Sequence, residues 1–206
     1  VWFLPSRWDG PGKVSGAVME YYWLEFRNFG YQSPYIAEMT NLDWLLLDLL
    51  ANRAGLPLHR FLGADRDWAA VYKGGGSVLL SDEALIQDLQ RFKDEGYQTT
   101  KFRIGGSGAG CSQDIRRLEK ARRALGDDFG IAVDANQAWD AKTAFAFAKE
   151  AAPFGVAWLE EPVHAYDMDA LRELRDLLNN AGIVMAIALG ESVRSSPTHV
   201  AYAPPG

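Results

Sequence analysis

Residues 131–139 read IAVDANQAW, and this stretch is the best guide to the fold because an apolar run ends abruptly in an acidic residue, Asp134. Two later stretches repeat the pattern: AWLEEPV at 157–163 contains Glu160, and AIALGES at 186–192 contains Glu191. A carboxylate at the end of a buried strand is costly unless a partner balances its charge. Three such ends in succession, separated by helical segments, predict that the three side chains share one metal ion.

Strand-like and helix-like segments alternate regularly from residue 68 onward. The apolar strand-like runs recur with a period of about 26 to 31 residues, ending near positions 76, 104, 135, 161 and 191. Helices are predicted between them, over residues 81–95, 112–125, 141–151 and 168–178. Ser81 is a predicted cap of the first helix, and Gly96 and Gly126 are predicted to end the first two. This order predicts parallel strands with right-handed crossovers.

A doubly wound sheet and a (β/α)₈ barrel both fit this order. The barrel is favoured because polar residues occupy the ends of successive strands, where a barrel would bring them to one site. The best candidate for a phosphate-binding loop, GGSGAGC at 105–111, has Cys111 where the fingerprint needs its third glycine, so we interpret it as a plain loop. The fold class predicted is α/β, a partial TIM-type barrel of about five βα units. A complete barrel needs eight, which indicates a fragment.

The segment before the barrel has two recognisable parts. AVMEYYWLEF at 17–26 is strand-like. Residues 40–54 are strongly apolar and predict a helix capped by Thr40 or Asn41. A wide stripe of leucines is predicted on one side of it, formed by Leu42, Leu45, Leu46, Leu49 and Leu50. Gly55 and Pro57 are predicted to end that helix.

Composition and charge exclude several classes of protein. The 206 residues are 48% hydrophobic, enough for a core, and the net charge of −6 argues against a nucleic-acid surface. Two arginine pairs, Arg116-Arg117 and Arg122-Arg123, are interpreted as the solvated face of one helix. The longest apolar run, Ile183–Leu189, is too short to cross a membrane. The single cysteine, Cys111, and the lack of a signal-peptide pattern predict a cytoplasmic protein.

The acidic residues define a candidate metal site. Two carboxylates about 4 Å apart repel by about 4 kcal/mol at an effective dielectric constant near 20, so three of them require a cation. Oxygen ligands favour Mg²⁺, and no His or Cys joins the set to indicate zinc. Asp134, Glu160 and Glu191 are therefore the predicted ligands. Asn136 is predicted to point to the same side and order a ligand or water, whereas Glu161 is predicted to face away, toward a helix N-terminus or an arginine.

Two cations on the second strand complete the candidate site. Lys101 and Arg103 are two residues apart, so both are predicted to face the barrel interior. Cations beside three acids and a metal suit a carboxylate substrate. Lys101 could act as a base, since burial and neighbouring cations lower the pKa of a lysine, whereas Arg103 does not readily lose its proton and is expected to hold an oxygen. The alternative is a structural salt bridge to Glu160 or Asp134.

Taken together, K-x-R at 101–103, VDANQAW, WLEEP and ALGES resemble the enolase superfamily in its mandelate racemase and muconate lactonizing branch. The stretch NLDWLLLDLLANRAGLPLHRFLGA at 41–64 is similar to the last helix of that branch's capping domain, so the resemblance spans about residues 40–192. It implies that residues 1–65 form an incomplete α+β capping domain. Residues 66–206 would then form the partial barrel that carries the metal site.

The resemblance implies a Mg²⁺-dependent lyase or isomerase. Such enzymes hold the metal with three strand-end acids and abstract the proton α to a substrate carboxylate, giving a metal-stabilised enediolate. The branch usually has a second lysine where this chain has Arg103, which favours Lys101 as the residue that neutralises the substrate carboxylate. His164 and His199 are interpreted as loop residues rather than as bases.

Sugar-acid dehydration is the expected reaction. Racemisation, epimerisation or cycloisomerisation on the same scaffold, an inactive metal-binding fragment, and a phosphate-binding doubly wound domain are the alternatives. A small carboxylate is the expected substrate, with no nucleic acid or membrane as partner. Aromatic residues near the N-terminus could also serve a contact in a homo-oligomer.

Overall fold

The computed structural model describes residues 34–106 and 111–192, together with Val18, Tyr21, Tyr22, residues 24–26 and Asn28. Contacts divide the chain into two compact units, one with its main segment ending at Ala69 and the other spanning Ala70–Glu191. Part of the glycine loop, residues 107–110, and the stretch 193–206 with His199 lie outside the described residues. None of the described helices has both the length and the apolar character needed to span a bilayer.

Two helices make up most of what is described in the first unit, α2 (Pro34–Arg53) and α3 (Leu58–Phe61). The predicted caps Thr40 and Asn41 are wrong, because both residues lie inside α2. The helix instead begins at a proline, which is favourable there because the first helical N–H has no partner within the helix. The described residues between 18 and 26 are also helical, so the strand-like interpretation of 17–26 is wrong for them.

The apolar contact between α2 and α3 is narrower than the predicted leucine stripe. Leu47 and Ala51 of α2 pack with Phe61 of α3, and all three are buried. Leu45 and Leu49, which belong to the predicted stripe, are 68% and 63% exposed. The predicted helix is therefore present, and Leu50 of the predicted stripe packs against this cluster, whereas Leu45 and Leu49 do not, so the predicted buried face is correct only in part.

The second unit contains a parallel five-stranded sheet in the order β1-β2-β3-β4-β5. The strands are β1 (Lys73–Gly75), β2 (Thr99–Arg103), β3 (Gly130–Asp134), β4 (Val156–Glu160) and β5 (Ile187–Ala188). The intervening helices are α4 (Asp82–Asp94), α5 (Ser112–Leu125), α6 (Ala141–Ala151), followed by η3 (Ala152–Phe154), and α7 (Met168–Asn180).

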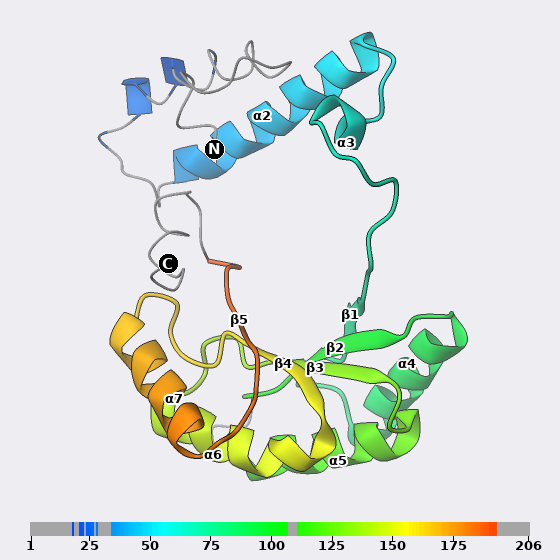
Figure 1. The fold of residues 1–206 in the computed structure, drawn as a ribbon, viewed down its shortest axis with the longest axis vertical. Helices are drawn as coiled ribbons and strands as arrows, with labels where there is room; N and C mark the ends of the chain where they lie inside the picture. Colours follow the sequence, from blue (N-terminus) through cyan, green and yellow to red (C-terminus); the bar gives the residue numbers. More distant parts are fainter. Residues whose placement is uncertain are drawn as a thin grey trace. The chain divides into compact units, whose positions relative to one another are not determined.

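The strand order distinguishes the two fold classes. In a doubly wound sheet the order reverses at a switch point, so that helices cover both faces. Here the order stays sequential, and helices α4, α5, α6 and α7 all lie on one face of the sheet (Figure 1). This is the arrangement of a (β/α) barrel, so the predicted partial barrel is confirmed.

The main core lies between the sheet and the helices. Leu85 and Leu89 of α4 pack in it with Phe102 of β2 and Val133 of β3. Because successive side chains of a strand point to opposite faces, burial of Phe102 on the helix side leaves Lys101 and its alternate neighbours on the inner face. The core therefore determines which side chains are available for a site.

The helix limits follow the capping residues closely. The Ser81 hydroxyl accepts a hydrogen bond from the backbone N–H of Ala84 at 3.2 Å, which confirms it as the cap of α4. Asp140 caps α6 in the same way, through the N–H of Thr143 at 2.7 Å. Helices α5 and α6 have the predicted limits, whereas α7 runs on to Asn180.

The interpretation of the arginine pairs is wrong for one member of each. Arg117 is buried and donates to the carbonyl oxygens of Ser77 and Leu80, in the loop that follows β1. Arg122 donates to the carbonyl oxygens of Phe129 and Phe154. Both guanidinium groups therefore tie loops to α5 rather than coat a solvated face.

Candidate metal centre

Three acidic side chains meet at the carboxyl ends of the strands. Asp134 is the last residue of β3 and Glu160 the last residue of β4, while Glu191 follows β5. One carboxylate oxygen from each lies within 4.8 Å of the others. Asp134 is buried, Glu160 is half-buried and Glu191 is exposed. The sheet brings them together because neighbouring parallel strands end at the same edge, with Asp134 directly beside Glu160 in the register.

Lys101 lies among these acids. Its Nζ is 2.6 Å from Oε1 of Glu160 and 3.2 Å from Oδ2 of Asp134, and its side chain is 17% exposed. Burial by itself would lower the pKa of Lys101, but the hydrogen bonds to Glu160 and Asp134 outweigh it and raise the pKa above its ordinary value. The salt bridge considered as an alternative from the sequence is thus present.

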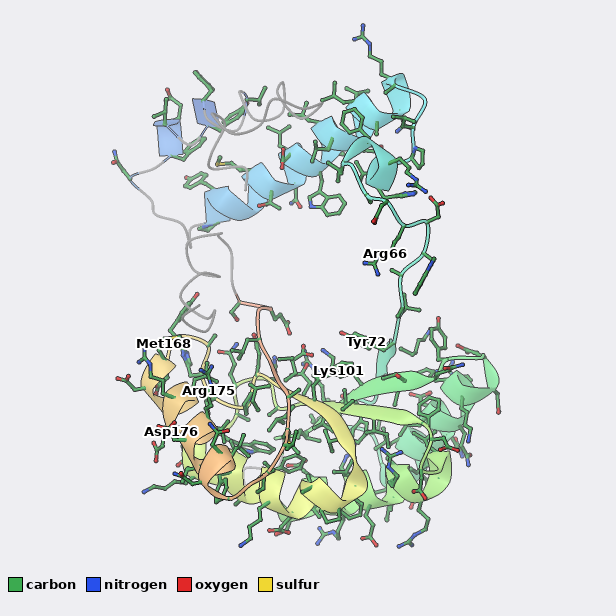
Figure 2. The ribbon with its side chains drawn as sticks, viewed as in Figure 1. Arg66, Tyr72, Lys101, Met168, Arg175 and Asp176 are labelled. Atoms are coloured by element: carbon green, nitrogen blue, oxygen red, sulfur yellow. The ribbon has the colours of Figure 1, made fainter. Side chains whose placement is uncertain are left out.

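The second oxygen of Glu160 has its own donor. The indole Nε1–H of Trp158 donates to Oε2 of Glu160 at 3.1 Å, and the Trp158 ring packs edge-on against Tyr72. Lys101 Nζ lies 5.9 Å from the centre of the Tyr72 ring, and Figure 2 places both residues on the side of the sheet away from the helices. Sequence reasoning missed Trp158, although its spacing of two from Glu160 put it on the same face.

A cavity of about 580 Å³ opens beside the acids. Glycines at the end of β1 form part of its wall, and its charged lining residues are Asp88, Lys101, Arg103, Asp134 and Glu191. Arg103 is exposed and pairs in register with Asp134 across β2 and β3. Two cations in a cavity beside the three acids suit an anionic ligand held next to a metal ion.

The residues just beyond the strand ends differ from expectation. Asn136 is exposed and is not among the residues that line the cavity. Its backbone N–H donates to Oδ1 of Asp134 at 2.9 Å. Glu161 is buried, and its carboxylate accepts a hydrogen bond from the side chain of Gln137 at 2.9 Å. The prediction that its partner is a helix N-terminus or an arginine is therefore wrong. His164 is an exposed loop residue, as predicted.

The donor set fits Mg²⁺. It offers carboxylate oxygens, and no His or Cys belongs to the cluster formed by the described residues. Bonds of about 2.1 Å place the oxygens around Mg²⁺ up to about 4.2 Å apart, so small side-chain rotations bring all three within reach. Lys101 balances only part of the negative charge of the three acids, which leaves the site favourable for a divalent cation.

Known proteins agree with this geometry. Residues 84–203 match a family model described as enolase C-terminal domain-like. L-talarate/galactarate dehydratase of Salmonella typhimurium is 35% identical over 171 residues, which cover 82% of this chain and 41% of that protein. Other curated relatives are named as gluconate and arabinonate dehydratases, epimerases and cycloisomerases. The chain spans roughly a third to a half of the length of these curated relatives.

Solved structures give the same result. L-talarate dehydratase from Polaromonas sp. JS666, solved with Mg and L-glucarate, superimposes with a TM-score of 0.77 at 30% identity, over 94% of this chain and 52% of that one. A racemase from Streptomyces coelicolor with bound magnesium gives a TM-score of 0.78 at 28% identity, over 86% of this chain and 48% of that one. Relatives thus bind magnesium, and this chain has an acidic triad that can hold a metal ion. The chain belongs to the enolase superfamily, in its mandelate racemase and muconate lactonizing branch.

Proposed function

We propose that this chain binds Mg²⁺ through Asp134, Glu160 and Glu191 and takes part in the dehydration of a sugar acid. The observation that carries the proposal is the meeting of Asp134, Glu160 and Glu191 at the strand ends, beside a cavity that Lys101 and Arg103 help to line. Support for the reaction comes from relatives named as dehydratases of talarate and galactarate, of gluconate and of arabinonate. The reaction removes the proton α to the carboxylate and expels the β-hydroxyl group.

Each group has a role that follows from its chemistry. When bound, Mg²⁺ would stabilise the negative charge that gathers on the substrate carboxylate as the α-proton leaves. Lys101, on the inner face beside the acids, neutralises the substrate carboxylate. Arg103 presents a planar fork of N–H donors to the cavity and holds a substrate oxygen. Asn136 is proposed to order substrate or water from its exposed position beyond the end of β3, outside the cavity lining.

The domain organisation is part of the proposal. Residues 1–65 would act as a capping domain that shapes specificity, and residues 66–206 would carry the metal site. The substrate choice of the whole protein depends on both parts.

A second candidate function is metal binding without turnover. It is favoured by the presence of Arg103 where the branch usually has a lysine, because arginine does not readily accept a proton. Isomerisation is an alternative reaction for this scaffold, because other relatives are named as an epimerase and a cycloisomerase.

Calorimetric titration with Mg²⁺ tests the metal site. Glu160→Gln removes a charged ligand, so we expect the dissociation constant to rise by at least about tenfold. Asp176→Asn, an exposed change on α7, is the matched control and is expected to bind like the wild type (Figure 2). Equal binding by the wild type and Glu160→Gln would contradict the proposed site.

Turnover separates the remaining candidates. The full chain is incubated with Mg²⁺ and a panel of sugar acids that includes galactarate, gluconate and arabinonate. A keto acid product supports dehydration, and an epimer formed without loss of water supports isomerisation. Tight Mg²⁺ binding with no change in any substrate supports the metal-binding function.

A further inference from the structure

Three residues beside the candidate metal centre have an unusual backbone conformation. Asn136, Gln137 and Glu161 have φ angles of 46°, 65° and 40°, and no other non-glycine residue in the described ranges has a positive φ. All three lie just beyond β3 and β4, whose last residues are Asp134 and Glu160. Such conformations are unfavourable for residues with a side chain and persist only where the surroundings hold them.

Hydrogen bonds between the two loops hold this conformation. The Gln137 side chain donates from Nε2 to Oε2 of Glu161 at 2.9 Å and accepts at Oε1 from the backbone N–H of Ala165 at 2.9 Å. The backbone N–H of Gln137 also donates to the carbonyl oxygen of Glu161 at 2.7 Å. We call this set of contacts the Gln137–Glu161 clasp. It joins the loop after β3 to the loop after β4.

The clasp includes a costly buried group. Glu161 is 1% exposed, and its Oε1 has no hydrogen-bond partner among the described residues. A buried carboxylate with one unpartnered oxygen is unfavourable, whereas apolar side chains could fill the same space without that cost. Packing alone therefore does not account for a glutamate at this position.

The clasp acts on the two acids through short links. The N–H of Asn136 donates to Oδ1 of Asp134 at 2.9 Å, and this fixes the Asp134 side chain. The N–H of Ala135 donates to the carbonyl oxygen of Glu160 at 2.9 Å, and this hydrogen bond fixes the end of β3 relative to the end of β4. Both links depend on the turns that the clasp stabilises.

We infer that Gln137 and Glu161 are positioning residues that hold Asp134 and Glu160 in the arrangement that binds the metal ion. The inference rests on the proposed function, since it assumes that these two acids are ligands. Ligands that are already held in place lose little freedom when the metal binds, so the clasp raises metal affinity without contacting the ion.

Calorimetric Mg²⁺ titration of the full chain, with urea unfolding in parallel, tests the inference. Gln137→Ala and Glu161→Ala break the clasp, and each is expected to raise the Mg²⁺ dissociation constant by about 10- to 100-fold. Gln137→Met keeps the volume of the side chain but removes its hydrogen bonds, and it is expected to weaken binding to the same extent. This variant keeps the test decisive where Gln137→Ala does not fold. Leu174→Ala, in the core of α7, is the control that lowers stability and leaves the Mg²⁺ affinity unchanged.

Glu161→Gln distinguishes positioning from charge. The amide keeps an oxygen that accepts from Gln137, so we expect the affinity to stay close to that of the wild type. Binding as weak as in Glu161→Ala would show that the charge of Glu161 matters instead, and this would overturn the inference. Wild-type affinity in both Gln137→Ala and Glu161→Ala would also overturn the inference, but it would leave the proposed metal site standing. A wild-type chain that does not bind Mg²⁺ would contradict both the proposed function and the inference.

Discussion

The environment of Glu160 shows how one hydrogen bond can prepare a metal ligand. Lys101 contacts Oε1 and the indole N–H of Trp158 holds Oε2, so the carboxylate plane is fixed from both sides. A bound cation would compete with the positive charge of Lys101 for the Glu160 carboxylate. The indole of Trp158 is neutral and can keep its hydrogen bond to Glu160 when the ion is present. Trp158 is therefore the contact expected to orient Glu160 in the loaded site.

Replacement of Trp158 by Phe removes this donor and keeps an aromatic ring against Tyr72. A hydrogen bond to a charged group contributes about 1.5–3 kcal/mol, so we expect Trp158→Phe to weaken Mg²⁺ binding by about tenfold or more. Calorimetric titration measures the change. Trp68→Phe is the control, because Trp68 is 71% exposed and lies outside the unit that carries the acids. Equal affinities in the two variants would show that the indole N–H does not contribute.

At the scale of single residues, the sequence predicts which way a side chain faces within a regular strand, but not in the turns that follow the strand ends. Asp134 and Glu160 close β3 and β4, so alternation and parallel pairing suffice to bring them together. The positive φ angles of Asn136 and Glu161 break that alternation, so the predicted facing of Asn136 and the predicted partner of Glu161 were unreliable. Burial of Arg117 was missed because its acceptors are backbone carbonyl groups, which leave no signal in the sequence.

At the scale of elements, helix limits were predictable where a side chain defines them. Ser81 at the start of α4 and Gly126 at the end of α5 are capping residues of the common kinds, and both predictions are confirmed. In α2, Thr40 and Asn41 are typical capping residues that nevertheless lie inside the helix. The useful signal was Pro34, because proline is favoured at the first helical position.

Two caps with different chemistry give a prediction for α4 and α6. Ser81→Ala and Asp140→Ala each remove an acceptor for a backbone N–H and are expected to cost about 1 kcal/mol of unfolding free energy near neutral pH. The hydrogen bond from the backbone N–H of Thr143 lowers the pKa of Asp140 below its ordinary value of 3.8. The contribution of Asp140 is therefore present above that value and is lost as the pH falls through the lowered pKa.

Urea unfolding at about pH 7 and at about pH 3 measures both costs. We expect the cost of Asp140→Ala to shrink on acidification, whereas that of Ser81→Ala stays constant because a serine hydroxyl does not titrate. Parallel behaviour of the two variants would show that protonation of Asp140 does not weaken its cap.

At the scale of the whole molecule, the candidate metal centre belongs to one unit. Asp134, Glu160 and Glu191 all lie within Ala70–Glu191, and they join the ends of β3 and β4 to the segment after β5. A ligand that binds only the folded protein stabilises it by about 2.7 kcal/mol at a hundredfold excess over its dissociation constant. Metal binding should therefore stabilise the strand ends of this unit and leave amides of the other unit unaffected.

Hydrogen–deuterium exchange with and without Mg²⁺ tests this localisation. The amides of Ala135, Gln137 and Glu161 donate between neighbouring strand ends, so we expect their exchange to slow when Mg²⁺ is bound. Amides within α2 are expected to exchange at the same rate in both conditions. Glu191→Gln provides the control, because loss of one ligand should abolish the protection at the same Mg²⁺ concentration. Protection that persists in this variant, or that extends to α2, would mean that the ion binds elsewhere or that its effect is not confined to the strand ends.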